Sequence, residues 1–393
     1  MRTTIHADAW FDGTALHREP LWLRIDQGRI AALHRGVGAG LAAEHQLGFV
    51  MPGMVEAHAH LFLDGGELDL ECRKAYLAAD IDTMLATGRA NLARSAEHGI
   101  TLIRDAGDRY GVNHRLRSQW RKHGLRVRSP GLALRKRGRY GSFMGEEVDG
   151  IADIEPMVAR RAAQGADDCK VLLTGIIDFA AAAVKGAPQF DLAELQAIVK
   201  AARLHGLPTF AHCSGRAGID LAIRAGIDSI EHGFFMESED LDRMAAARIA
   251  WVPTWSPVAF VRDNPALIGL DQAGQDGVAR ILDQHLRMIG EAHQRGVRLI
   301  AGSDAGSYGV VHGPALINEL RCFRAAGVPL EAVLHSATSA PRQAWAIPGG
   351  RITTGAPADL AAFSTVPDDH FTAFEQAELV LCRGEVVTAT LPA

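Results

Sequence analysis

The stretch GFVMPGMVEAHAH, residues 48–60, is the most informative segment of the sequence for fold and function. An apolar run leads directly into His58 and His60, which are separated by one alanine. Side chains two residues apart leave an extended strand on the same face, so both imidazoles can reach one cation. The spacing alone is a weak signal, because two histidines often fall this close by chance. The rest of the chain therefore has to decide whether the pair binds metal.

Composition and charge narrow the class of protein. The chain has 393 residues, 48% of them hydrophobic, which is enough for one large core and a smaller second unit. Its 41 Lys and Arg against 46 Asp and Glu give a net charge of -5 without long blocks of one sign. A nucleic-acid partner is therefore not expected.

The cysteines and the hydropathy pattern predict the cellular compartment of the protein. Five cysteines form no CxxC pair and are odd in number, which argues against a disulfide framework. The N-terminus lacks the apolar segment of a secretory signal, and no run of about 18 apolar residues occurs. We expect a cytoplasmic protein that does not enter a membrane.

Short β-rich runs alternate with amphipathic segments after residue 54. The expected strands are residues 54–58, 100–105, 126–134, 169–173, 208–212, 229–232, 250–254 and 298–302. The expected helices include residues 81–98, 151–164, 191–205, 215–225, 238–247, 276–295 and 313–326. Asp191 with Glu194 resembles a capping box, and glycines after several helices suit C-caps.

Eight such units predict the fold class: α/β, a (β/α)8 TIM barrel over residues 51–347. A doubly wound sheet is disfavoured, because no GxGxxG turn follows the first strand and polar residues gather at many strand ends. Short strands with tight turns at both ends of the chain predict a small β-sandwich domain from residues 1–50 and 348–393.

Several expected strands end in residues that can bind metal or move protons. They are His58 and His60 on the first strand, Lys170 on the fourth, His212 on the fifth, His232 on the sixth and Asp304 after the eighth. Active sites of barrels lie at the carboxyl ends of the strands. A single His or Asp after a strand is usually a cap, but this joint pattern favours one functional site.

These motifs resemble the metal-dependent amidohydrolase superfamily across nearly the whole chain. The matching segments are PGMVEAHAH (52–60), Lys170, His212, IEHG (230–233), AGSDA (301–305) and the closing GAPADL (355–360). The resemblance implies a site for two divalent metal ions. In it His58, His60 and Asp304 hold the more buried ion, His212 and His232 hold the more exposed one, and Lys170 bridges both as a CO2-derived carbamate.

The chemistry of these side chains agrees with the ligand set that the resemblance implies. A free ammonium would repel two cations, so Lys170 belongs in the site only when neutral or carboxylated. Imidazole and carboxylate ligands make Zn²⁺ the expected metal, with Mn²⁺, Fe²⁺ and Co²⁺ as alternatives. Two ions about 3.5 Å apart would generate a bridging hydroxide near neutral pH, and Asp304 would act as the catalytic proton shuttle.

Two features select a branch within the superfamily. Deaminase-like and imidazolone-opening members carry a Glu three residues after the fifth-strand His, where this chain has Gly215, and usually lack Lys170. The chain resembles the binuclear branch that contains Xaa-Pro and Xaa-Arg dipeptidases, with imidazolonepropionase-related amidohydrolases as further relatives. It departs from that branch in having no Gly-Gly-His turn after the third strand.

The predicted reaction is hydrolysis of a C-N bond, in a linear or cyclic amide, within a small substrate that carries a carboxylate. Arg135 and Arg139 are candidates to bind that carboxylate, and Tyr140 and His312 to donate hydrogen bonds to the substrate. The alternatives are a lactone or phosphoester hydrolase, an imidazolone or hydantoin ring hydrolase, and a metal-binding protein without catalysis. Whether the chain forms a homo-oligomer is left open.

Overall fold

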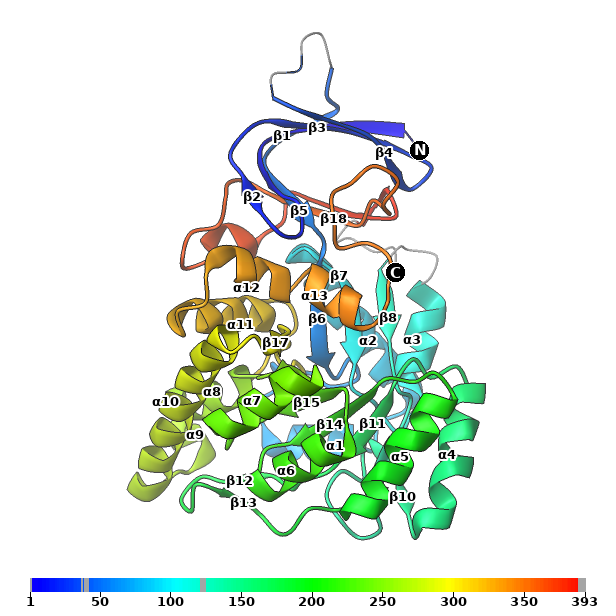
Figure 1. Ribbon diagram of the computed structural model, residues 1–393, viewed down its shortest axis with the longest axis vertical. Helices are drawn as coiled ribbons and strands as arrows, with labels where there is room; N and C mark the ends of the chain where they lie inside the picture. The colour runs from blue at the N-terminus through cyan, green and yellow to red at the C-terminus, as the bar shows by residue number, and fades with distance from the viewer. Residues whose placement is uncertain (1, 37, 39–41, 121–124, 388–393) are drawn as a thin grey trace.

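Strands and helices alternate through the middle of the chain, between two sets of mostly antiparallel strands from its ends (Figure 1). The computed structural model describes residues 2–36, 38, 42–120 and 125–387. Residues 1, 37, 39–41 and 388–393 of the predicted terminal domain lie outside the described residues, as do residues 121–124 of the predicted barrel. Within the described ranges, the protein has mixed α/β structure.

The strands in the middle of the chain pair in parallel. They are β6 (Met54–Ala59), β7 (Ile100–Asp105), β8 (Arg126–Arg128), β9 (Ala133–Lys136), β10 (Gly145–Val148), β11 (Cys169–Leu172), β14 (Thr209–Cys213), β15 (Ser229–His232), β16 (Ala250–Val252) and β17 (Arg298–Leu299). They form one sheet in the order β6-β7-β8 and another in the order β10-β9-β11-β14-β15-β16-β17. The strands predicted over 100–105 and 229–232 agree residue for residue.

The expected strand over residues 126–134 is interrupted. Pro130 has no backbone N–H to donate, and Gly131 adopts a φ of 71°, which strands do not use. The segment therefore divides into β8, which pairs with β7, and β9, which pairs with β11.

Residues 301–305, which follow β17, lie alongside β6. The amide of Ala57 donates to the carbonyl of Ala301 at 3.2 Å. The amide of Asp304 donates to the carbonyl of His58 at 2.7 Å, and the amide of His60 donates to Ala305 at 2.7 Å. This pairing brings the first and last segments of the parallel region together.

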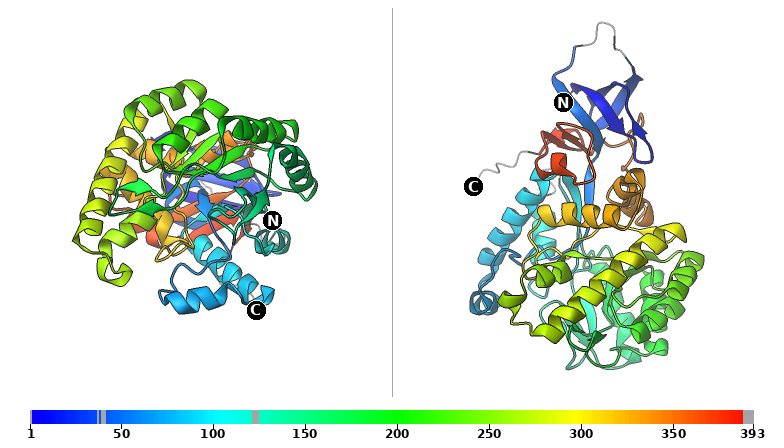
Figure 2. Two further views of the ribbon diagram at one scale, coloured as in Figure 1. Left: turned by 90° about the horizontal axis from the view of Figure 1, so that it is seen from below. Right: turned by 90° about the vertical axis from the view of Figure 1, so that its left-hand side faces the viewer.

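Helices cover the outside of the parallel strands (Figure 2). They are α1 (Leu70–Tyr76), α2 (Ile81–Glu97), α3 (Val112–Trp120), α4 (Ile151–Ala163), α5 (Leu192–Leu204), α6 (Arg216–Ala225), α7 (Ser238–Ala247), α8 (Ser256–Asp263), α9 (Pro265–Ile268), α10 (Gln272–Gln294), α11 (Pro314–Ala325), α12 (Leu330–Ser336) and α13 (Ser339–Ala344). The predicted capping box of Asp191 and Glu194 is confirmed at the start of α5. Gly99, Gly206 and Gly296 have φ values of 80°, 68° and 76° just after α2, α5 and α10, as C-caps require.

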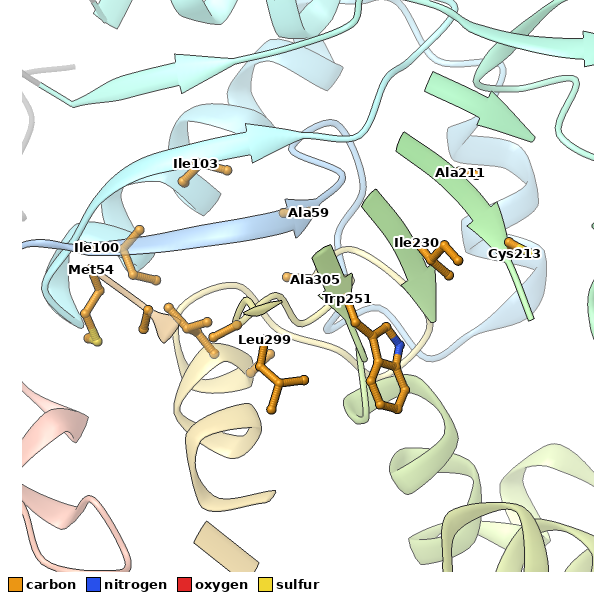
Figure 3. Close-up of a cluster of buried hydrophobic side chains, with 14 of the residues drawn as sticks. Met54, Ala59, Ile100, Ile103, Ala211, Cys213, Ile230, Trp251, Leu299 and Ala305 are labelled. Atoms are coloured by element: carbon orange, nitrogen blue, oxygen red, sulfur yellow. The ribbon is translucent and has the colours of Figure 1, made fainter. Parts of the chain in front are cut away.

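Apolar side chains fill the space between strands and helices (Figure 3). Met54 and Ile100 lie at the starts of β6 and β7, and Ala59 with Ala305 marks the junction of the first and last segments. All four are fully buried. The strands of the region are therefore held from outside by hydrophobic packing, while their carboxyl ends carry polar residues.

The two ends of the chain share one sheet. Its strands are β1 (Arg2–Phe11), β2 (Leu16–His17), β3 (Leu21–Asp26), β4 (Arg29–Arg35), β5 (His45–Pro52), β18 (Leu360–Phe363), β19 (Leu379–Cys382) and β20 (Glu385–Val386). Their order is β20-β19-β18-β5-β1-β3-β4, with β2 on β1, and only β1 and β5 pair in parallel. The remaining elements are the hairpin β12 (Ile177–Asp178) and β13 (Ala183–Val184) and the 3-10 helix η1 (Thr372–Glu375).

The predicted α/β class is confirmed at this level, with parallel strands and alternating helices. The strand pairing of the described residues is divided between two parallel sheets and does not by itself close a barrel. The terminal strands form one sheet among the described residues, so the sandwich and the domain limits stay predictions. In the described part of the chain, no helix combines the length and apolar character needed to span a membrane.

Candidate metal centre

Two histidines and one aspartate meet where the first and last segments pair. His58 lies near the end of β6 and His60 directly follows that strand. Their Nε2 atoms lie 3.7 and 3.5 Å from Oδ1 of Asp304. One ligand atom from each of the three residues lies within 4.8 Å of the others. The histidines are 1% and 4% exposed, whereas the side chain of Asp304 is 15% exposed. The cluster is suited to one buried cation, which the two histidines and Asp304 would hold together.

Two further histidines adjoin this cluster. His212 lies on β14 and His232 ends the neighbouring strand β15, and their ring centroids are 4.4 Å apart. The ring of His232 is also 5.1 Å from that of His58. The Nε2 atoms of His212 and His232 are buried and contact no hydrogen-bond partner in the described structure. Buried nitrogen atoms of this kind need a ligand, because an unsatisfied polar group destabilises the fold.

Hydrogen bonds at the opposite ring nitrogens orient three of these histidines. Nδ1 of His58 lies 2.6 Å from Oε2 of Glu231, and Nδ1 of His60 lies 3.3 Å from the carbonyl of Gly107. Carboxylate and carbonyl oxygens only accept, so each Nδ1 is the donor and each Nε2 keeps its lone pair. That lone pair is what a metal ion requires.

His232 has an equivalent partner in Thr254. Its Nδ1 lies 2.7 Å from Oγ1 of Thr254, and this hydroxyl donates to the carbonyl of Pro253 at 2.8 Å. Because the hydroxyl proton is used on Pro253, Oγ1 can only accept from His232. Nε2 of His232 is thereby left as the free lone pair of the ring.

Lys170 on β11 is also within the cluster, and it lacks the partner that a buried ammonium needs. It is 1% exposed, and its Nζ contacts only the Met144 Sδ at 3.6 Å within hydrogen-bond range in the described structure. Burial lowers the pKa of Lys170 to about 8, against the opposing effect of Asp304. A neutral amine at this position is accessible near neutral pH.

Burial dominates the electrostatics of the other side chains as well. It lowers the pKa of His58, His60 and His232 well below the usual value, with further lowering by neighbouring positive groups. These rings are therefore neutral in the folded protein, which is the form that binds metal.

Three residues of the site have backbone conformations that favour glycine. His232, Thr254 and Asp304 have φ values of 70°, 50° and 57°. The left-handed region costs a non-glycine residue about 1–3 kcal/mol, and such strain gathers at functional sites. The backbone at the end of β15 and in the segments after β16 and β17 thus orients these side chains at the expense of local stability.

The four candidate substrate-binding residues have different surroundings. Tyr140 reaches the cluster: its ring centroid is 5.5 Å from that of His212, and burial raises the pKa of its phenol. The guanidinium of Arg135 contacts Glu147 at 2.6 Å and the carbonyl of Arg139 at 2.9 Å. Arg139 itself donates to the carbonyl of Ala187. Both arginines therefore have protein partners already.

His312 is the fourth candidate. It is 1% exposed, and neither of its ring nitrogens has a partner in the described structure. Burial lowers its pKa to about 3, so the ring is neutral. His312 also contributes to the lowered pKa of His60, so the two rings influence each other electrostatically.

The orientation of the histidines was not predicted from the sequence. Glu231 receives hydrogen bonds from Arg104 at 2.8 Å and from Ser229 at 2.6 Å in addition to His58. A charged residue inside a strand that is buried on both faces needs such partners. That rule could have drawn attention to Glu231 and Arg104 from their positions in β15 and β7.

A second buried carboxylate joins the two segments that carry the ligands. Glu56 accepts from the amides of His58 at 3.0 Å and Ser303 at 2.9 Å, and from the hydroxyl of Ser303. It therefore holds β6 and the turn before Asp304 in register. No spacing rule in the sequence indicated this contact.

The comparisons with known proteins agree with this geometry. Residues 49–387 match the model of the amidohydrolase family, and the chain belongs to that family. It is therefore a hydrolase acting on carbon-nitrogen bonds.

Individual relatives are distant in sequence. Ochratoxinase of Aspergillus niger is 26% identical over 376 residues, covering 86% of this chain and 74% of that protein. Imidazolonepropionase of Ectopseudomonas mendocina is 26% identical over 421 residues, covering 96% of each.

Solved structures resemble the whole chain. A Xaa-Pro dipeptidase with bound methionine has a TM-score of 0.83 at 24% identity, covering 98% of this chain and 99% of the other. The structure of A. niger ochratoxinase has a TM-score of 0.79 at 22% identity, covering 98% and 95%. These structural similarities show that the chain shares the fold of those proteins, and nothing further.

Proposed function

We propose that the protein is a metal-dependent hydrolase that cleaves the amide or cyclic amide bond of a small substrate carrying a carboxylate. The observation that carries this proposal is the meeting of four neutral histidines, with Asp304 and Lys170, at the carboxyl ends of the parallel strands. Two of the four have buried Nε2 atoms without partners. Such a donor set fits divalent transition metals, above all Zn²⁺, with Mn²⁺, Fe²⁺ or Co²⁺ as alternatives.

The donors divide between two ions. His58, His60 and Asp304 would hold one, and His212 and His232 the other. Lys170 would bridge the two as a carbamate formed with CO2. The thioether contact of Lys170 supports this assignment, because a buried ammonium would be expected to pair with a carboxylate.

Bound divalent ions lower the pKa of a coordinated water and polarise the substrate carbonyl. The residues of the chain supply the remaining functions. Asp304 is the most exposed member of the buried trio, so its carboxylate can take the proton of the nucleophilic water and deliver it to the leaving nitrogen. The hydroxyl of Tyr140 beside His212 is the best candidate to donate to the carbonyl oxygen.

Ring opening of a cyclic imidazolone or hydantoin is the second candidate. The coverage of 96% of both chains in the match to an imidazolonepropionase favours it. Gly215, the N-cap of α6, has no side chain with which to shuttle a proton after His212, and this weighs toward linear amides.

A substrate panel tests the proposal. Zinc-loaded protein would be assayed on an N-acyl amino acid, a dipeptide, a hydantoin, a lactone and a phosphotriester. Turnover of an amide substrate, linear or cyclic, is expected, with about two metal ions bound per chain. Exclusive turnover of the lactone or the phosphotriester would contradict it.

We also propose that the parallel strands form a (β/α)8 barrel over residues 51–347, with a small β-sandwich from residues 1–50 and 348–393. The pairing of β6 with residues 301–305 supports closure of the barrel. All five cysteines are free, which supports a reducing, cytoplasmic location. A small-molecule substrate is the expected partner.

A further inference from the structure

A cavity of about 420 Å³ lies beside the candidate metal centre, between α1, α2 and the loop that carries Phe143. Its lining residues are Leu63, Asp64, Glu67, Cys72, Arg73, Lys74, Tyr76, Leu77, Thr83, Thr87 and Phe143. None of the proposed metal ligands is among them. The cavity is therefore a separate space that adjoins the site.

Two contacts link the cavity to the metal ligands. On one side, the amide of Leu63 donates to the carbonyl of His60 at 3.0 Å. On the other, the ring of Phe143 lies edge-on to that of Tyr140, with centroids 6.1 Å apart. Tyr140 in turn packs on His212 at 5.5 Å. The cavity therefore lies near the proposed reaction centre, with Leu63 three residues after His60 on one side and the ring of Tyr140 between Phe143 and His212 on the other.

The charged residues of the lining are already paired with the protein. The guanidinium of Arg73 donates to the carbonyls of Asp64, Glu67 and Gly306. The carboxylates of Asp64 and Glu67 accept from the amides of Gly66 and Asp69, each at 2.8 Å.

Lys74 is the remaining charged residue of the lining. Its side chain is 79% exposed, and it lies 4.0 Å from Glu71. The charged side chains of the lining therefore either contact backbone groups or lie exposed, and none is buried without a protein partner.

What remains for a ligand is apolar surface. Leu63, Tyr76, Leu77 and Phe143 are partly buried and pack on the main core. Helix α1, which covers the cavity, has no buried residue. The phenol of Tyr76 donates to the carbonyl of Phe62, and Thr87 donates to the carbonyl of Thr83. The polar atoms are again used within the protein.

We infer that this cavity binds an apolar group of the substrate, an alkyl chain or an aromatic ring attached near the scissile amide. Its volume is within the range of ligand pockets, about 300–1,000 Å³. The inference rests on the proposed function and deepens it: the substrate is an amide with one apolar arm, which the cavity recognises by hydrophobic burial.

Matched substrates test the assignment. One series is N-acyl-L-alanine with acetyl, hexanoyl and 4-phenylbutanoyl groups, and the other is N-acetyl-L-alanine, leucine and phenylalanine. The cavity holds one apolar arm, so kcat/KM is expected to rise in the series that varies this arm, by about fourfold per added methylene. Equal kcat/KM values across both series would overturn the inference.

Filling the cavity supplies the matched control. Thr87→Trp on α2 should abolish the gain for the long substrates and leave the kcat of the shortest one unchanged. Ala86→Trp, one residue along the same helix and outside the lining, should keep the gain. A gain that survives Thr87→Trp in a folded protein contradicts the inference.

A binding measurement separates this inference from the proposed reaction. Cys72 lines the cavity and is the exposed cysteine of the five, so its alkylation by iodoacetamide reports occupancy. In the zinc-loaded wild type, 4-phenylbutanoate should slow alkylation at least tenfold and acetate should not. Protection without hydrolysis of any amide would support apolar binding in the cavity and refute the proposed reaction. Hydrolysis without protection would support the reaction and refute apolar binding in the cavity.

Discussion

Oε2 of Glu231 lies 2.6 Å from Nδ1 of His58, and both side chains are almost fully buried. The same carboxylate receives Arg104 at 2.8 Å, whose guanidinium lies over the ring of Phe210. This arrangement fixes the tautomer of His58 and turns its Nε2 toward Asp304. The orientation of the candidate ligand is thus set by residues that do not belong to the ligand set.

Glu231→Gln should weaken metal binding by about 10- to 100-fold, because the amide can present its NH2 to His58 and favour the wrong tautomer. Competition with a chelator, followed by metal analysis, measures this without reference to activity. Glu239→Gln in α7 is the matched control and should retain wild-type affinity. Unchanged affinity in folded Glu231→Gln would show that the contact has no role in orienting His58.

Lys170 should carry a carbamate when the protein is loaded with zinc in the presence of bicarbonate. Loading with 13C-labelled bicarbonate should give a carbamate signal in the 13C spectrum of the wild type. Lys170→Arg should lack the signal and bind fewer than two metal ions, because a guanidinium stays protonated and does not react with CO2. A wild-type spectrum without the signal, at full metal content, would refute the carbamate.

Asp304→Asn should lower kcat by about 10²- to 10⁴-fold on the best amide substrate, since the amide side chain can no longer accept a proton. Circular dichroism should show an unchanged fold. The side-chain amide oxygen of the variant would remain as a weaker metal ligand. Metal content must be measured in parallel. Near-normal kcat in the variant is incompatible with a proton-shuttle role.

Glu319 should make the stability of the metal-free protein fall as the pH rises. Burial raises the pKa of Glu319 to about 8, above the 4.5 of an unperturbed glutamate. Between these values the folded state binds more protons than the unfolded state, so the free energy of unfolding decreases with pH. Its two oxygens accept from the amides of Trp255 at 2.9 Å and Ser256 at 2.7 Å.

Urea unfolding at pH 5 and pH 8 measures this effect. Glu319→Gln should be less stable at pH 5, because its NH2 faces a backbone donor, and should show a smaller loss between the two pH values. The comparison uses the difference between variant and wild type, since Glu56 and Asp105 also have pKa values raised to about 7. Identical pH slopes in both proteins would assign the dependence to other groups.

The local sequence predicted most elements because each carries its own signal. The limits of β7, β15 and α7 followed from apolar runs and turn residues, and the start of α5 followed from its capping box. The break between β8 and β9 was missed, although Pro130 and Gly131 are its physical cause. The hairpin β12-β13 and the short helix α1 were also missed, since neither has a periodic pattern long enough to detect.

The sequence by itself determined which residues form the candidate metal centre. Parallel strands bring their carboxyl ends to one edge. Lys170 lies within β11, and the other five residues lie near or after the ends of their strands: His58, His60, His212, His232 and Asp304. This can be read from strand order, because the side chains are positioned by the backbone that carries them.

Only the tertiary structure decided how those side chains are oriented and what surrounds them. The contact of Glu231 with His58 joins residues 173 positions apart, and that of Glu56 with Ser303 joins residues 247 apart. Likewise, Arg135 and Arg139 were predicted from charge alone, and packing gave both of them protein partners. Such contacts depend on distances between distant segments, which folding fixes and local sequence does not encode.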